Sequence, residues 1–111
     1  MFRKKSPAAQ SGPVELDPAE VSARMGRGEI VLVDVREPNE IGAERIPGAV
    51  SIPLSQFDPA ALPKGEVVLS CLSGKRSAMA LTKCRQAGAA VTSHMRGGLM
   101  AWKATGLPTA R

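Results

Sequence analysis

The sequence predicts an α/β domain with a largely parallel sheet. Two nearly continuous apolar runs, residues 30–35 and 66–70, are typical of strands that are buried on both faces. Segments with helical spacing alternate with these runs, and that alternation indicates strands joined by crossover helices. The length of 111 residues fits one domain, and an apolar content of 43% is enough for one core.

The first elements are a short strand over residues 14–16 and a helix directly after it. The signals for this helix are a capping acid, a proline at the first helical position and an acid three residues after the cap. An apolar pair spaced four apart and two closing glycines complete the pattern. These residues are, in order, Asp17, Pro18, Glu20, Val21, Met25, Gly26 and Gly28.

The remaining elements follow from shorter patterns. We expect a strand stopped by Pro53, a helical turn, a helix closed by Gly88, a last strand and a short helix that ends before Gly106; their residues are 49–52, 55–61, 77–87, 91–95 and 99–102. The apolar stripe of the longest helix is predicted to contain Ala78, Leu81, Cys84 and the stem of Arg85. Cys84 is therefore expected to be a core residue.

Cys71 follows the second long run and opens a loop that leads into a helix. Ligands of parallel sheets bind beyond the carboxyl ends of the strands, and Cys71 lies there. The loop Cys71-Leu72-Ser73-Gly74-Lys75-Arg76 carries two cations, and its backbone N–H groups are placed to form an anion-binding nest. Cations and helix N-termini favour the thiolate, which is the nucleophilic form of cysteine. Cys71 is thus a candidate nucleophile, with a buried structural cysteine as the alternative.

Other polar residues are candidates for a place in or near the site. Arg36 is expected to pair with Asp34 or Glu37 and to brace the loop that follows, rather than to act in catalysis. His94, the single histidine, is a possible general base, but its place in a presumed strand makes a catalytic role the less favoured reading. Two cysteines and one histidine at no ligand-like spacing predict neither a metal site nor a cofactor.

The composition of the chain limits the classes of partner that we expect. The net charge of +5 favours anions, although it also fits an ordinary basic protein. Three aromatic residues are too few for a base-stacking surface, and no run approaches the ~20 apolar residues of a membrane helix, so neither nucleic acid nor membrane is an expected partner. Residues 1–13 read as a flexible basic tail without the apolar stretch of a secretory signal. Few cysteines favour the reducing cytoplasm, and a monomer is expected.

Several segments of the chain resemble the rhodanese homology domain family. In order along the chain, they are Asp34–Glu40 with Ile46–Leu54, the loop Cys71–Ser77, and Gly97–Trp102 followed by Gly106–Pro108. The resemblance covers residues 14–108 and leaves residues 109–111 as a C-terminal tail. It implies a five-stranded, mainly parallel sheet with helices on both faces.

The resemblance also implies a sulfurtransferase activity. Cys71 would take sulfane sulfur from a donor such as thiosulfate, hold it as a persulfide and pass it to a thiophilic acceptor such as cyanide or a thiol. The backbone N–H groups of the substrate-binding residues Leu72, Ser73, Gly74, Lys75, Arg76 and Ser77 would surround this persulfide. Within that set, Arg76 would brace the loop and help to hold the anion, and Lys75 would meet thiosulfate.

Alternative functions stay open at this point. The six-residue loop from Cys71 to Arg76 resembles sulfurtransferases, since related phosphatases have one residue more and usually a histidine where this chain has Ser70. A phosphatase or arsenate reductase is therefore the weaker reading, as is a non-catalytic domain. Many members carry arginine where this chain has Leu72, and Gly-His where it has Glu44-Arg45. The loss of a loop charge favours a less charged donor or a sulfur-relay module fed by a partner protein.

Overall fold

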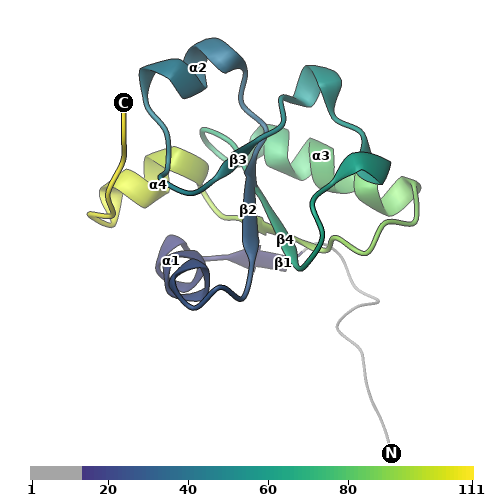
Figure 1. Cartoon of the computed structure of the whole chain (residues 1–111), viewed down its shortest axis with the longest axis horizontal. Helices are drawn as coiled ribbons and strands as arrows, with labels where there is room; N and C mark the ends of the chain where they lie inside the picture. The colour runs from purple at the N-terminus through teal and green to yellow at the C-terminus, as the bar shows by residue number, and fades with distance from the viewer. Residues whose placement is uncertain (1–13) are drawn as a thin grey trace, which may run out of the picture.

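The computed structural model describes residues 14–111, which are built around one five-stranded sheet (Figure 1). The strand order is β1-β5-β4-β2-β3, and every neighbouring pair runs parallel. The strands are β1 Val14–Leu16, β2 Val31–Asp34, β3 Val50–Ser51, β4 Val67–Ser70 and β5 Ser93–Met95. This topology confirms the predicted fold class. The expected basic tail, residues 1–13, lies outside the described residues.

Helices cover both faces of the sheet. They are α1 Pro18–Gly26, α2 Pro38–Ala43, α3 Lys75–Gln86 and α4 Gly98–Ala104, with two short 3₁₀ turns, η3 Leu54–Gln56 and η4 Pro59–Ala61. Figure 1 shows α1 and α4 next to each other, on the opposite side of the sheet from α3. Among the described residues, no helix combines the length and apolar character needed to cross a membrane.

The central strands explain why the core has two halves. Successive side chains of a strand point to opposite faces, so Leu32 packs with the α1–α4 layer and Val33 packs with the α3 layer. Strand β4 alternates in the same way, with Val68 in the first layer and Leu69 in the second. The continuous apolar runs predicted this burial on both faces. The carboxyl end of β4 therefore emerges between the two helical layers.

Two local predictions about the helices were wrong. The Asp17 side chain does not cap α1; its carboxylate instead lies 2.7 Å from the guanidinium of Arg96, because a full cation competes well with backbone N–H groups. On α3, Ala78 is only half-buried and Arg85 is exposed, whereas Ser77 and Ala80 are buried. The inner face of α3 is set by Leu81 and Cys84, and each step along a helix turns the side chain by about 100°.

Helix α2 was not predicted. It has no fully buried residue, so it lacks the apolar periodicity by which a helix is recognised. Its start is fixed by Pro38 at the first position and by Glu40, whose carboxylate accepts the backbone N–H of Glu37 at 3.0 Å.

The expected C-terminal tail packs against the segment that follows α2. Ala110 and Arg45 exchange two backbone hydrogen bonds of 2.8 Å. Beside them, the Thr109 hydroxyl donates to the Glu44 carboxylate at 2.7 Å. These contacts fasten the C-terminal residues to the segment that follows α2.

Candidate active site

Cys71 comes directly after β4, and its side chain is 1% exposed. The backbone around it is held by the start of α4, because the Leu99 N–H donates to the Cys71 carbonyl at 2.8 Å and the Met100 N–H donates to the Leu72 carbonyl at 3.0 Å. The cysteine thus lies between the carboxyl end of β4 and the start of α3, where the sequence places it, and the structure adds the start of α4 as a third neighbour.

Two backbone N–H groups point at the sulfur of Cys71. The Gly74 N–H donates to Sγ at 3.1 Å and the Ser77 N–H donates to it at 3.3 Å. Gly74 has a φ of +103°, which suits glycine and turns the chain into the first turn of α3. Because unpaired N–H groups at a helix start carry partial positive charge, this arrangement stabilises negative charge on or beside Sγ.

Most of the other loop side chains are exposed, but Arg76 is held against α2. Leu72, Ser73 and Lys75 are exposed, whereas Arg76 is half-buried against α2. Its guanidinium makes two contacts with the Glu40 carboxylate, at 2.6 and 2.9 Å. The hydrogen bond from Arg76 lowers the pKa of Glu40 to about 2, and the same contact raises the pKa of the guanidinium. Arg76 therefore ties the loop to α2 through an ion pair that sequence reasoning did not anticipate.

Asp34 and Arg36 form a buried ion pair at the end of β2. The Arg36 Nε lies 3.1 and 3.0 Å from the two carboxylate oxygens, and the Arg36 backbone N–H donates to the same carboxylate at 2.9 Å. Arg36 also donates to the Glu44 carbonyl at 2.8 Å, just after α2. These contacts hold the segment around α2 in place, and the predicted supporting role is consistent with them but stays a prediction.

His94 lies against the candidate site. The residue is buried, and Nδ1 is 2.8 Å from the Ser77 hydroxyl, which in turn is 3.6 Å from the Cys71 sulfur. On the other side of the ring, Nε2 is 3.4 Å from the Glu15 carboxylate. Burial lowers the pKa of His94, and Glu15 opposes that effect. The signal available in the sequence was a histidine inside an expected strand; that this strand lies next to β4 is shown by the structure.

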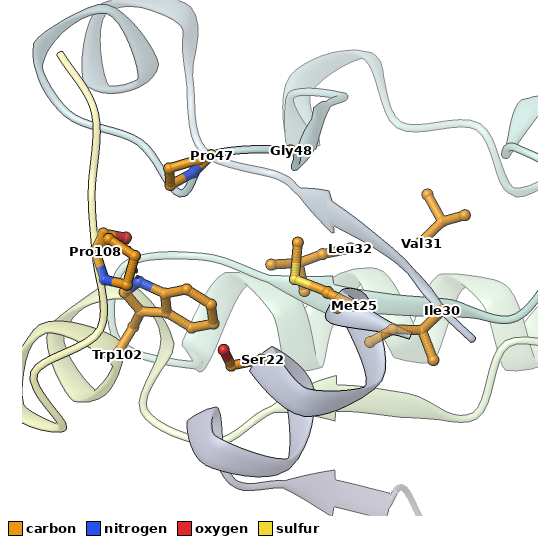
Figure 2. Close-up of a pocket in the computed structure, with 10 residues that line it drawn as sticks. Ser22, Met25, Ile30, Val31, Leu32, Pro47, Gly48, Trp102 and Pro108 are labelled. Carbon is orange, nitrogen blue, oxygen red and sulfur yellow. Dashed lines mark hydrogen bonds between the residues drawn. The ribbon is translucent and has the colours of Figure 1, made fainter. Parts of the chain in front are cut away.

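The structure contains one cavity beside the cysteine loop and another beside α1. One, of about 600 Å³, lies beside the loop and is lined by Lys75, Glu15, His94 and Arg96, among others. Another, of about 420 Å³, lies between α1 and the start of β2; Figure 2 shows Trp102 and Pro108 at one side of it, and none of the predicted site residues line it.

Cys84 lies on α3, in the same apolar cluster as Cys71. It is fully buried among apolar side chains, where desolvation raises the pKa of its thiol, and it forms no disulfide. The prediction that Cys84 is a core residue is confirmed.

The fold and the site together define an α/β protein in which a loop at the carboxyl edge of a parallel sheet directs backbone N–H groups at a cysteine sulfur. The sequence profile of the rhodanese-like domain matches residues 17–105. The chain belongs to the rhodanese-like domain family, which confirms the resemblance noted in the sequence.

Relatives and solved structures agree with this assignment. The chain is 38% identical over 98 residues to a sulfurtransferase of Allochromatium vinosum, covering 85% of this chain and 92% of that protein. It is 48% identical over 85 residues to an uncharacterized Synechocystis protein, covering 74% of this chain but only 48% of the relative. A rhodanese-related protein of Thermoplasma volcanium superposes with a TM-score of 0.77 at 25% identity, over 87% of this chain and 97% of the other.

Proposed function

We propose that this protein is a sulfurtransferase that carries sulfane sulfur as a persulfide on Cys71. The observation that carries the proposal is the pair of backbone N–H groups, from Gly74 and Ser77, aimed at Sγ. They would stabilise the thiolate before the reaction and the terminal persulfide sulfur after it. Membership of a family that includes a protein named as a sulfurtransferase supports the same chemistry.

With thiosulfate as donor, the reaction has two steps. The Cys71 thiolate attacks the sulfane sulfur, a new S–S bond forms, and the S–S bond of thiosulfate breaks so that sulfite leaves with the electron pair. A nucleophilic acceptor, such as cyanide or a thiol, then attacks the outer sulfur, and the Cys71 thiolate leaves. Lys75, exposed in the loop, would attract the dianionic donor.

A second candidate is a sulfur relay fed by a partner protein. Leu72 is 37% exposed and Met100 is 59% exposed, and a backbone hydrogen bond of 3.0 Å joins the two residues beside Cys71. An apolar rim of this kind suits a protein surface better than a small anion. In either case a reducing compartment, such as the cytoplasm, would keep the Cys71 thiol available.

Whole-protein mass spectrometry after thiosulfate treatment tests the proposal. We expect wild type and Cys84→Ser to gain one sulfur atom each and Cys71→Ser to gain none, because Sγ of Cys71 is the proposed attachment point. Thiocyanate formation from cyanide should follow the same pattern. Sulfur uptake by Cys71→Ser that is lost in Cys84→Ser would overturn the assignment.

The two sulfur donors are separated by comparing rates of loading. A relay is favoured if a cysteine desulfurase loads Cys71 readily while thiosulfate gives negligible turnover. Measurable hydrolysis of a phosphate ester that depends on Cys71 would instead support the phosphatase reading, against which the six-residue loop argues.

A further inference from the structure

A chain of polar contacts leads from the reactive sulfur to the outer edge of the sheet. The Cys71 Sγ is 3.6 Å from the Ser77 Oγ, which is 2.8 Å from Nδ1 of His94. The Nε2 of the same ring is 3.4 Å from the Glu15 carboxylate on β1. Four segments of the chain, the end of β4, α3, β5 and β1, therefore contribute one link each.

We propose that His94 is a positioning residue that receives the Cys71 thiol proton through the Ser77 hydroxyl, with Glu15 supporting the imidazolium that results. The inference deepens the proposed function, since it rests on Cys71 being the nucleophile. It assigns a role to the buried, titratable imidazole of His94, which takes no part in the sulfur-transfer steps themselves.

The Ser77 hydroxyl is 2.8 Å from Nδ1 of His94 and 3.1 Å from the Gly74 carbonyl, so its single proton must point toward His94, the nearer acceptor, for the transfer to begin. In the thiol state the Cys71 S–H donates to the Ser77 Oγ, and the Ser77 O–H donates to the unprotonated Nδ1 of His94. In the thiolate state both protons have moved one step, so that the Ser77 O–H donates to Sγ and the Nδ1–H of His94 donates to Oγ. One S–H bond breaks and one N–H bond forms, and charge is balanced between the thiolate and the imidazolium.

The surroundings of His94 fit a group that is neutral at rest and can take up a proton. Burial lowers the pKa of His94, which keeps Nδ1 free as an acceptor, while the Glu15 carboxylate favours the charged ring. The charged and titratable groups around the ring, from every element packed against it, are Glu15 on β1, Cys71 after β4, Lys75 on α3 and Arg96 after β5, which pairs with Asp17.

The alkylation rate of Cys71 against pH tests the relay without any sulfur donor. In His94→Asn the carboxamide can still bond to Ser77 but takes up no proton at neutral pH. We expect the Cys71 alkylation rate at neutral pH to fall about tenfold in this variant, with the midpoint of the rate profile about one pH unit higher. A merely structural role would be rescued by asparagine, and an unchanged profile would overturn the proposal.

Three further variants test the route of the proton, and a fourth is the control. Ser77→Ala should lower the rate as much as His94→Asn, and the double variant should lose no more than either, since both interrupt one path. Glu15→Gln should act in the same direction but less, because its carboxylate is exposed to solvent. Ser93→Ala, a neighbouring buried polar change on β5, should leave the profile unaltered. Additive losses in the double variant would contradict a shared path.

Nuclear magnetic resonance gives a second readout in chains that retain their fold. The chain has a single histidine, so a tag-free sample shows one imidazole titration. We expect its midpoint to fall in Cys71→Ala, because the thiolate that stabilises the imidazolium is gone, and a midpoint that does not move would overturn the relay. If the relay tests succeed while thiosulfate and desulfurase both fail to load Cys71, the proposed function is wrong and the proton path remains.

Discussion

Gly98 lies where α4 touches the loop of Cys71. A Cβ atom at this position would be 2.3 Å from the Cys71 carbonyl oxygen and 2.6 Å from the Leu72 carbonyl carbon. Its φ of +57° is also in the left-handed region that favours glycine. The missing side chain is what allows the next two N–H groups, of Leu99 and Met100, to reach the loop carbonyls.

Gly98→Ala should therefore displace the loop and weaken persulfide formation. The added methyl group would meet backbone atoms, which cannot move aside as a flexible side chain can. We therefore expect the unfolding free energy to fall by about 2 kcal/mol or more, together with a large loss of sulfur loading. Gly106→Ala is the matched control, since Gly106 has a φ of +86° but open space around its Cβ position. Denaturant unfolding and mass spectrometry check both variants, and equal effects in the two would contradict the crowding argument.

At the scale of elements, the ion pair between Glu40 and Arg76 joins α2 to the start of α3. The contact depresses the pKa of Glu40 from 4.5 to about 2. A carboxylate with a depressed pKa in the folded state adds stability above its unfolded pKa and loses it as pH falls through the folded value. The pair thus contributes at neutral pH, and its contribution disappears between about pH 4.5 and pH 2.

Glu40→Gln should remove that dependence. We expect about 1 kcal/mol less unfolding free energy at neutral pH, because the pair is partly exposed, and a flatter decline between pH 4.5 and 2. Denaturant unfolding at several pH values measures both effects. Glu20→Gln, which removes the exposed pair with Arg24 inside α1, is the control and should cost about 0.5 kcal/mol or less. An acid limb identical to wild type would contradict the prediction.

Most of the succession of strands and helices along the chain was predictable from the sequence, and the reasons are local. Strands β2 and β4 are buried on both faces, so their apolar runs carry the signal without help from the rest of the fold. The loop from Cys71 to Arg76 could also be predicted, because its signals are consecutive in the chain: a strand end, a glycine, two cations and a helix start.

Contacts between distant segments were not readable. Helix α2 gains its place from Glu40 and Arg36, whose partners are a guanidinium of α3 and a buried carboxylate of β2. His94 reads as an ordinary strand residue until the register of β5 with β4 sets it opposite Leu69. Such pairings depend on strand order and helix docking, which neither periodicity nor composition records.

The whole molecule depends on its two buried layers. Leu69 is fully buried in the central strand β4, whereas Leu72, three residues later, is 37% exposed. Leu69→Ala should lower the unfolding free energy by about 2–5 kcal/mol through lost apolar contact and a residual cavity. The same change at Leu72 should alter it by about 0.5 kcal/mol or less, since that side chain already meets water. Thermal or denaturant unfolding of the two variants measures both changes. Comparable losses of unfolding free energy in the two would contradict the layered core.

The hydrogen bonds from Leu99 and Met100 to the cysteine loop have a consequence during synthesis of the chain. A ribosome adds residues from the N-terminus, so Cys71 emerges well before α4 can dock. Until then the carbonyls of Cys71 and Leu72 lack these two donors, and the loop around the sulfur is not held in its final geometry. The geometry around Sγ is therefore complete only once α4 has docked against the loop.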